Sequence, residues 1–168
     1  MNFEFNVFTE RNSVSKVCLN SPDDLVILTG NSGIGKSLTF ELIEEFYTQA
    51  TEKELNDFDM PKQYFLYSPI DDSHTPALVG KLKTMSTEGL IVIDDLDEVL
   101  SNCSNVRELL DSILNAKCKV IVICKRVPPP LKLPDRFFFN LVIKDGVATI
   151  EQTLKEGLYG VVKNNYTL

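Results

Sequence analysis

The strongest constraint on this chain is a glycine-rich loop sequence that follows directly on an apolar run. The residues Gly30-Asn31-Ser32-Gly33-Ile34-Gly35-Lys36-Ser37 come immediately after Leu25-Val26-Ile27-Leu28. They match the pattern G-x-x-x-x-G-K-[ST] at every fixed position, in which a tight turn joins a buried strand to a helix. Glycines let successive backbone N–H groups turn inward, and the helix N-terminus adds positive dipole character. The sequence therefore predicts a strand, a phosphate-binding loop and a helix.

We expect this loop to bind a nucleotide together with Mg²⁺. Lys36 would reach the β- and γ-phosphate oxygens, and the hydroxyl of Ser37 would be a ligand of Mg²⁺, which prefers octahedral oxygen coordination. A bare glycine-rich string is often only a turn, but the apolar run before it and the helical pattern after it favour nucleotide binding. The predicted nucleotide contacts are Gly30, Asn31, Ser32, Gly33, Ile34, Gly35, Lys36, Ser37 and Leu38.

A second apolar run ends in paired carboxylates, Leu90-Ile91-Val92-Ile93-Asp94-Asp95. A buried central strand whose carboxyl end points at a metal site has this composition, which is typical of a Walker B segment. Asp94 is expected to hold the Mg²⁺ shell, and Asp95 is the first choice for the base that orients and deprotonates water. Asp97 and Glu98 are rivals for that role. The alternative interpretation is an ordinary strand followed by the acidic N-terminus of a helix, where the dipole favours Asp and Glu.

Length and composition predict one ordinary globular domain over residues 1–168. The chain is 43% hydrophobic and 24% charged, as expected of a globular protein. It contains no apolar run of about 18 residues that could span a membrane, and its start lacks the pattern of a signal peptide. We therefore expect a cytoplasmic protein. Its four cysteines, at spacings without a C-x-x-C motif, are expected to be reduced thiols and not zinc ligands or disulfides.

The net charge of −7 argues against a general nucleic-acid binder, but the charge is unevenly distributed. Residues 117–144 carry seven Lys or Arg residues against the single acid Asp135. Such a basic stretch could meet nucleotide phosphates, a nucleic-acid strand or an acidic partner protein. A solvated face is the more common explanation, so nucleic-acid binding through 117–144 is not favoured.

Hydrophobic periodicity predicts alternating strands and helices, and hence a doubly wound, mostly parallel sheet with its site at the strand carboxyl ends. The N-terminal 1–20 is expected to form a β-hairpin at a sheet edge, and Gly157–Leu168 a short helix or loose tail. The expected strands of the core are Leu25–Thr29, Gln63–Tyr67, the run ending at Ile93, Lys119–Cys124 and Phe137–Ile143, followed by Val147–Ile150 after an Asp-Gly turn. The expected helices are Lys36–Gln49, Pro76–Met85 and Val106–Leu114, with a polar connection over Thr51–Met60.

The additional strand Gln63–Tyr67 between the phosphate-loop strand and the Walker B strand makes the chain resemble the additional-strand P-loop ATPases. These include the AAA-type, RecA-like and signal-transduction ATPases, and the resemblance covers about residues 25–143. It implies a three-layer fold with sheet order 5-1-4-3-2. The segment Leu90–Leu100 looks most like the NACHT and other signal-transduction ATPases, whose Walker B strand is followed by a small residue and then Leu-Asp-Glu. This chain has Asp95 at the small-residue position.

The same resemblance gives a role to the end of the strand Lys119–Cys124. Related ATPases place a polar or basic sensor of the γ-phosphate there, and Arg126 lies where the signal-transduction group has its Arg. An Arg at this position could stabilise charge on the transferred phosphoryl group, although an exposed Arg after a strand is more often a solubilising residue. Val127-Pro128-Pro129-Pro130 is expected to continue as an extended connection.

Three function classes remain open. The first, which we favour, is a Mg²⁺-dependent ATPase that acts as a switch or small motor. The second is a nucleotide-binding regulatory module that hydrolyses little ATP and needs a partner protein or another copy of itself to complete the site. The third is a small-molecule kinase, although no Arg-rich lid is recognisable. The absence of an Asn-Lys-x-Asp motif favours ATP over GTP. The chain also looks similar to small uncharacterised bacterial ATP-binding proteins.

Overall fold

Four apolar segments form an all-parallel group of strands at the centre of the molecule. They are β3 (Leu25–Thr29), β4 (Gln63–Tyr67), β5 (Gly89–Ile93) and β6 (Lys119–Cys124), and they lie in the order β4-β5-β6-β3. The register places Ile91 of β5 opposite Val120 of β6, and Ile27 of β3 opposite Val122 of β6. The predicted α/β architecture with a largely parallel sheet is confirmed in these elements.

The computed structural model describes residues 2–8, 14–21, 23–30, 36–57, 61–68, 75–131, 137–144, 147–154 and 163–166. Side chains are described for residue 21 and for 23–30, 37–56, 61–68 and 75–131. The predicted phosphate-loop residues 31–35 therefore lie outside the described residues. So do the turn expected at 10–13 and the Asp-Gly turn at 145–146.

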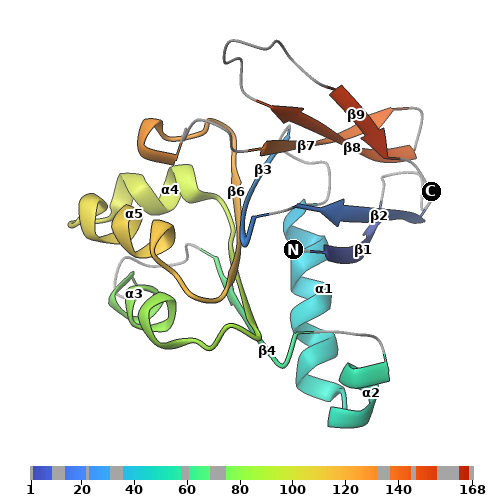
Figure 1. Cartoon of the computed structure of the whole chain (residues 1–168), viewed down its shortest axis with the longest axis horizontal. Coiled ribbons are helices and arrows are strands. Elements are labelled where there is room, and N and C mark those ends of the chain that lie inside the picture. Colours follow the sequence, from blue (N-terminus) through green and yellow to red (C-terminus); the bar gives the residue numbers. More distant parts are fainter. Residues whose placement is uncertain are drawn as a thin grey trace.

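Helices cover both faces of the sheet (Figure 1). α3 (Thr75–Thr84), α4 (Leu96–Asn102) and α5 (Val106–Leu114) lie on one face, where Leu78, Leu96 and Leu109 are fully buried with Ile91 in one core cluster. α1 (Lys36–Gln49) lies on the opposite face, where Phe40 is fully buried. Because both faces are covered, the central strands are continuous apolar runs without polar alternation.

Three further strands extend the sheet beyond β3. β7 (Phe137–Lys144) pairs parallel to β3, and β8 (Val147–Leu154) and β9 (Lys163–Tyr166) follow as antiparallel neighbours. The expectation of a short helix or loose tail at the C-terminus is wrong for Lys163–Tyr166, which pairs with β8. An edge strand needs only backbone hydrogen bonds on one side, so its sequence need not show a strong apolar pattern.

The predicted N-terminal hairpin forms, but not at the edge of the large sheet. β1 (Asn2–Phe8) and β2 (Val14–Asn20) pair antiparallel, with Phe5 opposite Val17, as a separate two-stranded sheet. β1 lies against α1 and β2 lies against β8. The expected edge position is wrong because β7, β8 and β9 already extend the sheet on the β3 side.

Three short helical elements depart from the predicted loops. α2 (Glu52–Asp57) interrupts the expected polar connection, because Thr51 and Glu54 form a capping box in which the Thr51 N–H donates to Glu54 Oε2 at 2.8 Å. α4 begins directly after Asp95, at the acidic segment for which the sequence offers a helix start as the alternative interpretation. Pro129–Leu131 forms a 3₁₀ turn and not an extended connection, closed by the N–H of Leu131, which donates to Pro128 O at 2.9 Å.

Candidate functional site

The predicted phosphate loop joins a buried strand to a helix, as its pattern requires. β3 is buried through Leu28 and ends at Thr29, Gly30 follows partly buried, and α1 begins at Lys36. In the first turn of α1 the side chains of Ser37 and Leu38 are exposed, whereas Thr39 and Phe40 are buried. The exposed side chain of Ser37 thus lies in the first turn of α1, the helix that follows the carboxyl end of β3 along the chain.

The Asp94 carboxylate lies at the carboxyl end of a strand that is buried along its whole length. All five residues of β5 are buried, and Asp94 itself is only 7% exposed. Its N–H donates to Tyr67 O of β4 at 2.9 Å, which fixes the backbone at the strand end. Its Oδ1 accepts the N–H of Asp95 at 2.9 Å. A buried carboxylate held in one orientation is the kind of group that a metal ion or a reacting water requires.

Asp95 has a left-handed backbone conformation, with φ 44° and ψ 58°. Among the described residues it is the one non-glycine residue with positive φ, a conformation that Asp tolerates better than most residues. It is also the N-cap of α4, because its Oδ1 accepts the N–H of Glu98 at 3.4 Å. Its Oδ2 lies 3.9 Å from the Nζ of Lys125, with the Asp95 side chain one-third exposed.

Asp97 contacts the segment that leaves β6. Its Oδ2 accepts the backbone N–H of Lys125 at 2.7 Å, and its Oδ1 accepts that of Arg126 at 3.4 Å. The structure therefore brings Asp94, Asp95 and Asp97 together with the Lys125–Arg126 turn at one end of the sheet. Glu98, the third candidate base, is exposed on the first turn of α4.

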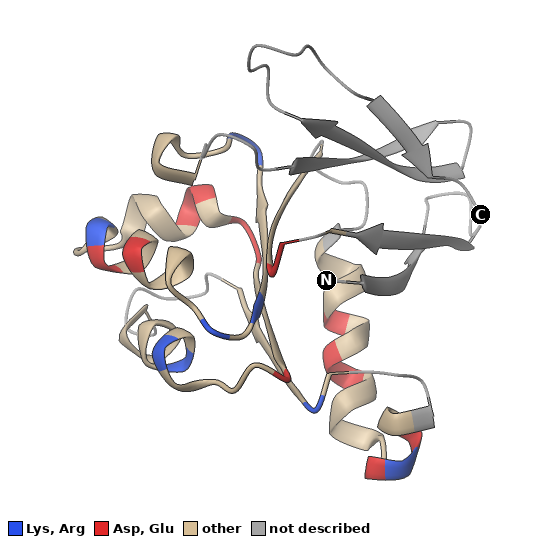
Figure 2. Cartoon of the chain, in the orientation of Figure 1, with Lys and Arg blue, Asp and Glu red and all other residues tan. Residues whose placement is uncertain are grey.

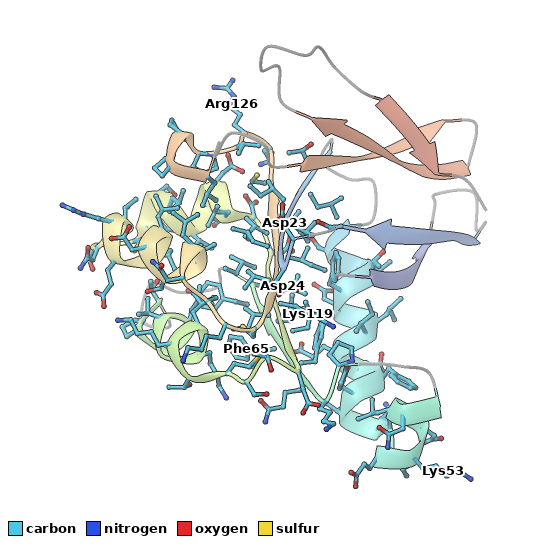
Figure 3. The ribbon with its side chains drawn as sticks, viewed as in Figure 1. Asp23, Asp24, Lys53, Phe65, Lys119 and Arg126 are labelled. Carbon is cyan, nitrogen blue, oxygen red and sulfur yellow. The ribbon has the colours of Figure 1, made fainter. Side chains whose placement is uncertain are left out.

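The Arg126 side chain is exposed and points away from the sheet at the carboxyl end of β6 (Figure 3). The residue before the turn, Cys124, is buried. Figure 2 shows basic residues at the end of β6 beside the acids that follow β5. Opposite charges thus lie close together where the two strands end, and Lys125 forms the ion pair with Asp95 between them.

The basic stretch predicted over 117–144 does not form one patch in its described part. Lys117 and Lys119 lie at the start of β6, whereas Lys125 and Arg126 follow its end (Figure 3 labels Lys119 and Arg126). The side chains of Lys132, Arg136 and Lys144 lie outside the described residues. Within the described part, positive charge is therefore divided between opposite ends of the sheet.

Three described cysteines form no disulfide, Cys103, Cys118 and Cys124. Burial raises the pKa of the Cys118 thiol, so that thiol stays protonated at neutral pH. Within the described side chains, no group of three or more His, Cys, Asp or Glu residues is arranged to hold a metal ion. The predicted Mg²⁺ site consists of one hydroxyl and one carboxylate, so it does not belong to this type of cluster. Among the described helices none has both the length and the apolar character needed to cross a membrane.

A cavity of about 400 Å³ lies between α3 and α5. Its lining includes Leu82, Lys83, Arg107, Glu108 and Asp111, none of which is a predicted site residue. Lys83 and Glu108 bridge it with an ion pair of 2.8 Å, and Lys83 lowers the pKa of Glu108 by donating a hydrogen bond to it. This cavity is separate from the acidic cluster at the carboxyl ends of the strands.

Sequence reasoning missed the two contacts through which Asp95 and Asp97 reach the exit of β6. Both join residues about 30 positions apart in the chain, and no local pattern reports such pairs. One signal was present for Asp95. It occupies a position where similar ATPases have a small residue, and Asp is among the few residues that adopt the left-handed region.

Comparison with known proteins gives a fold likeness. No protein-family model and no curated protein sequence matches the chain. Among solved structures, the cytoplasmic domain of the Thermomonospora curvata Type VII secretion ATPase EccC is similar, with a TM-score of 0.51 at 12% identity. The match covers 98% of this chain and 26% of that one, so this chain spans about a quarter of its length. At this identity the likeness concerns the fold, an α/β domain found in an ATPase.

Proposed function

We propose that the chain binds ATP with Mg²⁺ and hydrolyses it, acting as a switch or small motor. The observation that carries the proposal is the arrangement of β3, β6 and β5. β6 lies between β3 and β5, and the three parallel strands have their carboxyl ends on the same side of the sheet. β3 leads into the G-x-x-x-x-G-K-S sequence, and β5 is followed by the buried carboxylate of Asp94. Ligands bind at this edge of open parallel sheets. The fold likeness to an ATPase supports the same interpretation.

Strand order supports membership of the additional-strand P-loop ATPases. The five strands that pair in parallel lie in the spatial order β7-β3-β6-β5-β4. If they are numbered along the chain with β3 as the first, this order is 5-1-4-3-2. That is the order which the resemblance implied. Asp95 in the left-handed region also suits the position where the NACHT-like segment has a small residue. A glycine is the default residue in that conformation, and Asp is a common substitute.

The predicted nucleotide contacts run from Gly30 to Leu38, with Lys36 on the β- and γ-phosphates. Ser37 and Asp94 would hold Mg²⁺, since a hydroxyl and a carboxylate are the oxygen donors that this ion prefers. The exposure of Ser37 at the start of α1 and the fixed, nearly buried carboxylate of Asp94 fit this role. When bound, the ion would neutralise negative charge on the phosphates.

Asp95 is our candidate for the base that orients the attacking water. Its Oδ2 is on the side of Lys125, and the side chain is partly exposed to solvent. Arg126 is the candidate for contact with the γ-phosphate. Because its side chain is exposed and points outward, contact with a nucleotide would require it to turn back toward the loop or to serve a nucleotide held by another copy.

That outward direction also favours the second candidate function, a regulatory module that hydrolyses little ATP alone. In such a module a partner protein or a second copy would complete the charge around the γ-phosphate. The two candidates share the nucleotide site and differ in turnover. They are therefore separated by rate and not by affinity.

The test is ADP release from ATP and Mg²⁺ by the parent, Lys36→Ala and Asp95→Asn. Lys36→Ala is expected to weaken ATP binding sharply, because it removes the cation on the phosphates. Asp95→Asn is expected to bind ATP like the parent and to lose turnover by roughly 100-fold or more, the usual effect of removing a general base. ATP affinity is measured separately with a fluorescent analogue.

Each outcome has a defined meaning. If Lys36→Ala binds ATP as tightly as the parent, the nucleotide site is misassigned. If Asp95→Asn turns over ATP like the parent, Asp95 is not the base, and Asp97 becomes the candidate. Binding without release above the Lys36→Ala level favours the regulatory module.

A further inference from the structure

The carboxylate of Asp97 binds the backbone of a distant turn with both of its oxygens. Oδ2 accepts the N–H of Lys125 at 2.7 Å and Oδ1 accepts the N–H of Arg126 at 3.4 Å. Hydrogen bonds from backbone N–H groups to an ionised carboxylate are about twice as strong as neutral ones. The first turn of α4 is thereby attached to the point where the chain leaves β6.

This attachment fixes the backbone that carries Lys125 and Arg126, and Arg126 is the candidate for contact with the γ-phosphate. Two successive amides held by one carboxylate define the direction in which the residues that carry them project. Lys125 then reaches back, so that its Nζ lies 3.9 Å from Asp95 Oδ2. Arg126 projects from the same turn at the carboxyl end of β6 (Figure 3). Asp95 and Asp97 therefore contact the same turn in different ways, the first through a side chain and the second through the backbone.

These contacts distinguish Asp97 from a catalytic base. A general base needs an oxygen within hydrogen-bond reach of the proton it removes. Both oxygens of Asp97 already accept backbone N–H groups, those of Lys125 and Arg126. Asp95 differs because its Oδ2 lies 3.9 Å from the side-chain ammonium of Lys125 and not against a backbone amide.

We propose that Asp97 is a positioning residue that holds the Lys125–Arg126 turn against α4 and so places Lys125 beside Asp95 and Arg126 at the carboxyl end of β6. This inference rests on the proposed function, because Arg126 on this turn is the candidate for contact with the γ-phosphate. It assigns Asp97 to the backbone of the turn and leaves the chemistry to Asp95.

A double-mutant cycle tests whether Asp97 acts through this turn. Asp97→Asn is measured in the parent and in a background that carries Lys125→Ala and Arg126→Ala, where no side chain remains to be positioned. In the parent we expect a loss in kcat of roughly tenfold, as for other residues that orient a reacting group through a second residue. In the background the same substitution is expected to cost less than about twofold. Asp111→Asn, which removes an exposed carboxylate on α5, is the matched control.

Amide hydrogen exchange gives a second readout that does not depend on turnover. The N–H groups of Lys125 and Arg126 are expected to exchange faster in Asp97→Asn than in the parent and in Asp111→Asn. Unchanged exchange at both amides overturns the proposal, as does an equal loss of kcat in the parent and in the background. A parent that releases no more ADP than Lys36→Ala contradicts the proposed function instead, and the exchange rates then decide the role of Asp97 alone.

Discussion

At the scale of single residues, the acidic run that follows β5 divides into groups with different environments. Asp94 is nearly buried and held by its neighbour's N–H, Asp95 caps α4 from the left-handed region, and Asp97 binds the exit of β6. The sequence shows four acids in five positions but not this division. Local composition predicts that carboxylates gather at the strand end. Their individual orientations depend on the backbone angle of one residue and on a turn far along the chain.

The conformation of Asp95 predicts an unusual order of stability among its variants. Asp95→Gly and Asp95→Ala both remove the carboxylate and its cap on Glu98, but only glycine adopts φ 44° without a steric cost. We therefore expect Asp95→Gly to be the more stable of the two by about 1 kcal/mol. In an ordinary helical position the order would be the reverse.

Urea unfolding of the two variants, followed by circular dichroism, measures this difference in the free energy of unfolding. The reference pair is Ser101→Gly and Ser101→Ala, at an exposed position within α4, where alanine should be favoured. If Asp95→Ala were as stable as Asp95→Gly, the residue would not need the left-handed conformation.

At the scale of elements, the apolar runs were predictable and the polar helices were not. Three elements form with the predicted bounds: Leu25–Thr29, Lys119–Cys124 and Val106–Leu114. They were predictable because a buried strand is a continuous apolar run and a half-buried helix has apolar residues along one face. α2 depends on a capping box among polar residues, and α4 on the cap at Asp95. Caps of this kind add about 1 kcal/mol each and compete with many equivalent turns, so they are weak signals in a single sequence.

The attachment of α1 to β4 is an element-scale contact with a testable pH dependence. The hydroxyl of Tyr64 on β4 donates to Phe40 O of α1 at 2.9 Å, and its ring stacks on that of Tyr47 with 4.9 Å between the centroids. Burial, and then the negative charges of Glu44 and Asp94, raise the pKa of Tyr64 well above its ordinary value. Tyr64→Phe keeps the ring and removes the hydroxyl, so we expect a loss of about 1 kcal/mol in stability near neutral pH.

The raised pKa also fixes the sign of the alkaline effect. The folded state holds the phenol proton more tightly than the unfolded state, whose pKa is about 10. The stabilisation is complete below that value and is lost as pH rises through the raised pKa of the folded protein. The free energy of unfolding should therefore decrease more between about pH 8 and about pH 11 for the parent than for Tyr64→Phe. Parallel slopes would contradict the assignment of a buried, proton-retaining Tyr64.

At the scale of the whole molecule, the sheet brings together segments that are far apart in the sequence. β3, the strand before the predicted phosphate loop, lies beside β6 and not beside the strand that follows it in the chain, and β7 lies on its other side. Residue patterns predict that these strands exist, and the right-handed crossover rule predicts that they are parallel. Which strand lies beside which was inferred from resemblance alone. The sequence could not show that β7, β8 and β9 extend the sheet beyond β3 and that the hairpin therefore forms a sheet of its own. Backbone pairing at a sheet edge has little effect on amino-acid composition.

The position of Arg126 leads to the last prediction, which concerns more than one molecule. Its side chain is exposed and points away from the sheet (Figure 3), and we expect it to serve a nucleotide bound by a neighbouring copy if the protein self-associates. An arginine supplied by another subunit can raise phosphoryl-transfer rates by a factor of about 10³ or more. If a second copy completes the site, ADP release per molecule will rise with protein concentration and then level off as the assembly saturates.

The measurement is the initial rate of ADP release across a wide range of protein concentrations, with Arg126→Ala and Lys36→Ala assayed alone and mixed. Each variant alone should be slow. A mixture should recover part of the rate, because an intact Arg126 from the Lys36→Ala subunit would serve the intact phosphate loop of the Arg126→Ala subunit. Arg107→Ala, which removes an exposed arginine on α5, should behave like the parent. A rate per molecule independent of concentration, with no recovery in the mixture, would confine Arg126 to its own subunit or exclude it from the reaction.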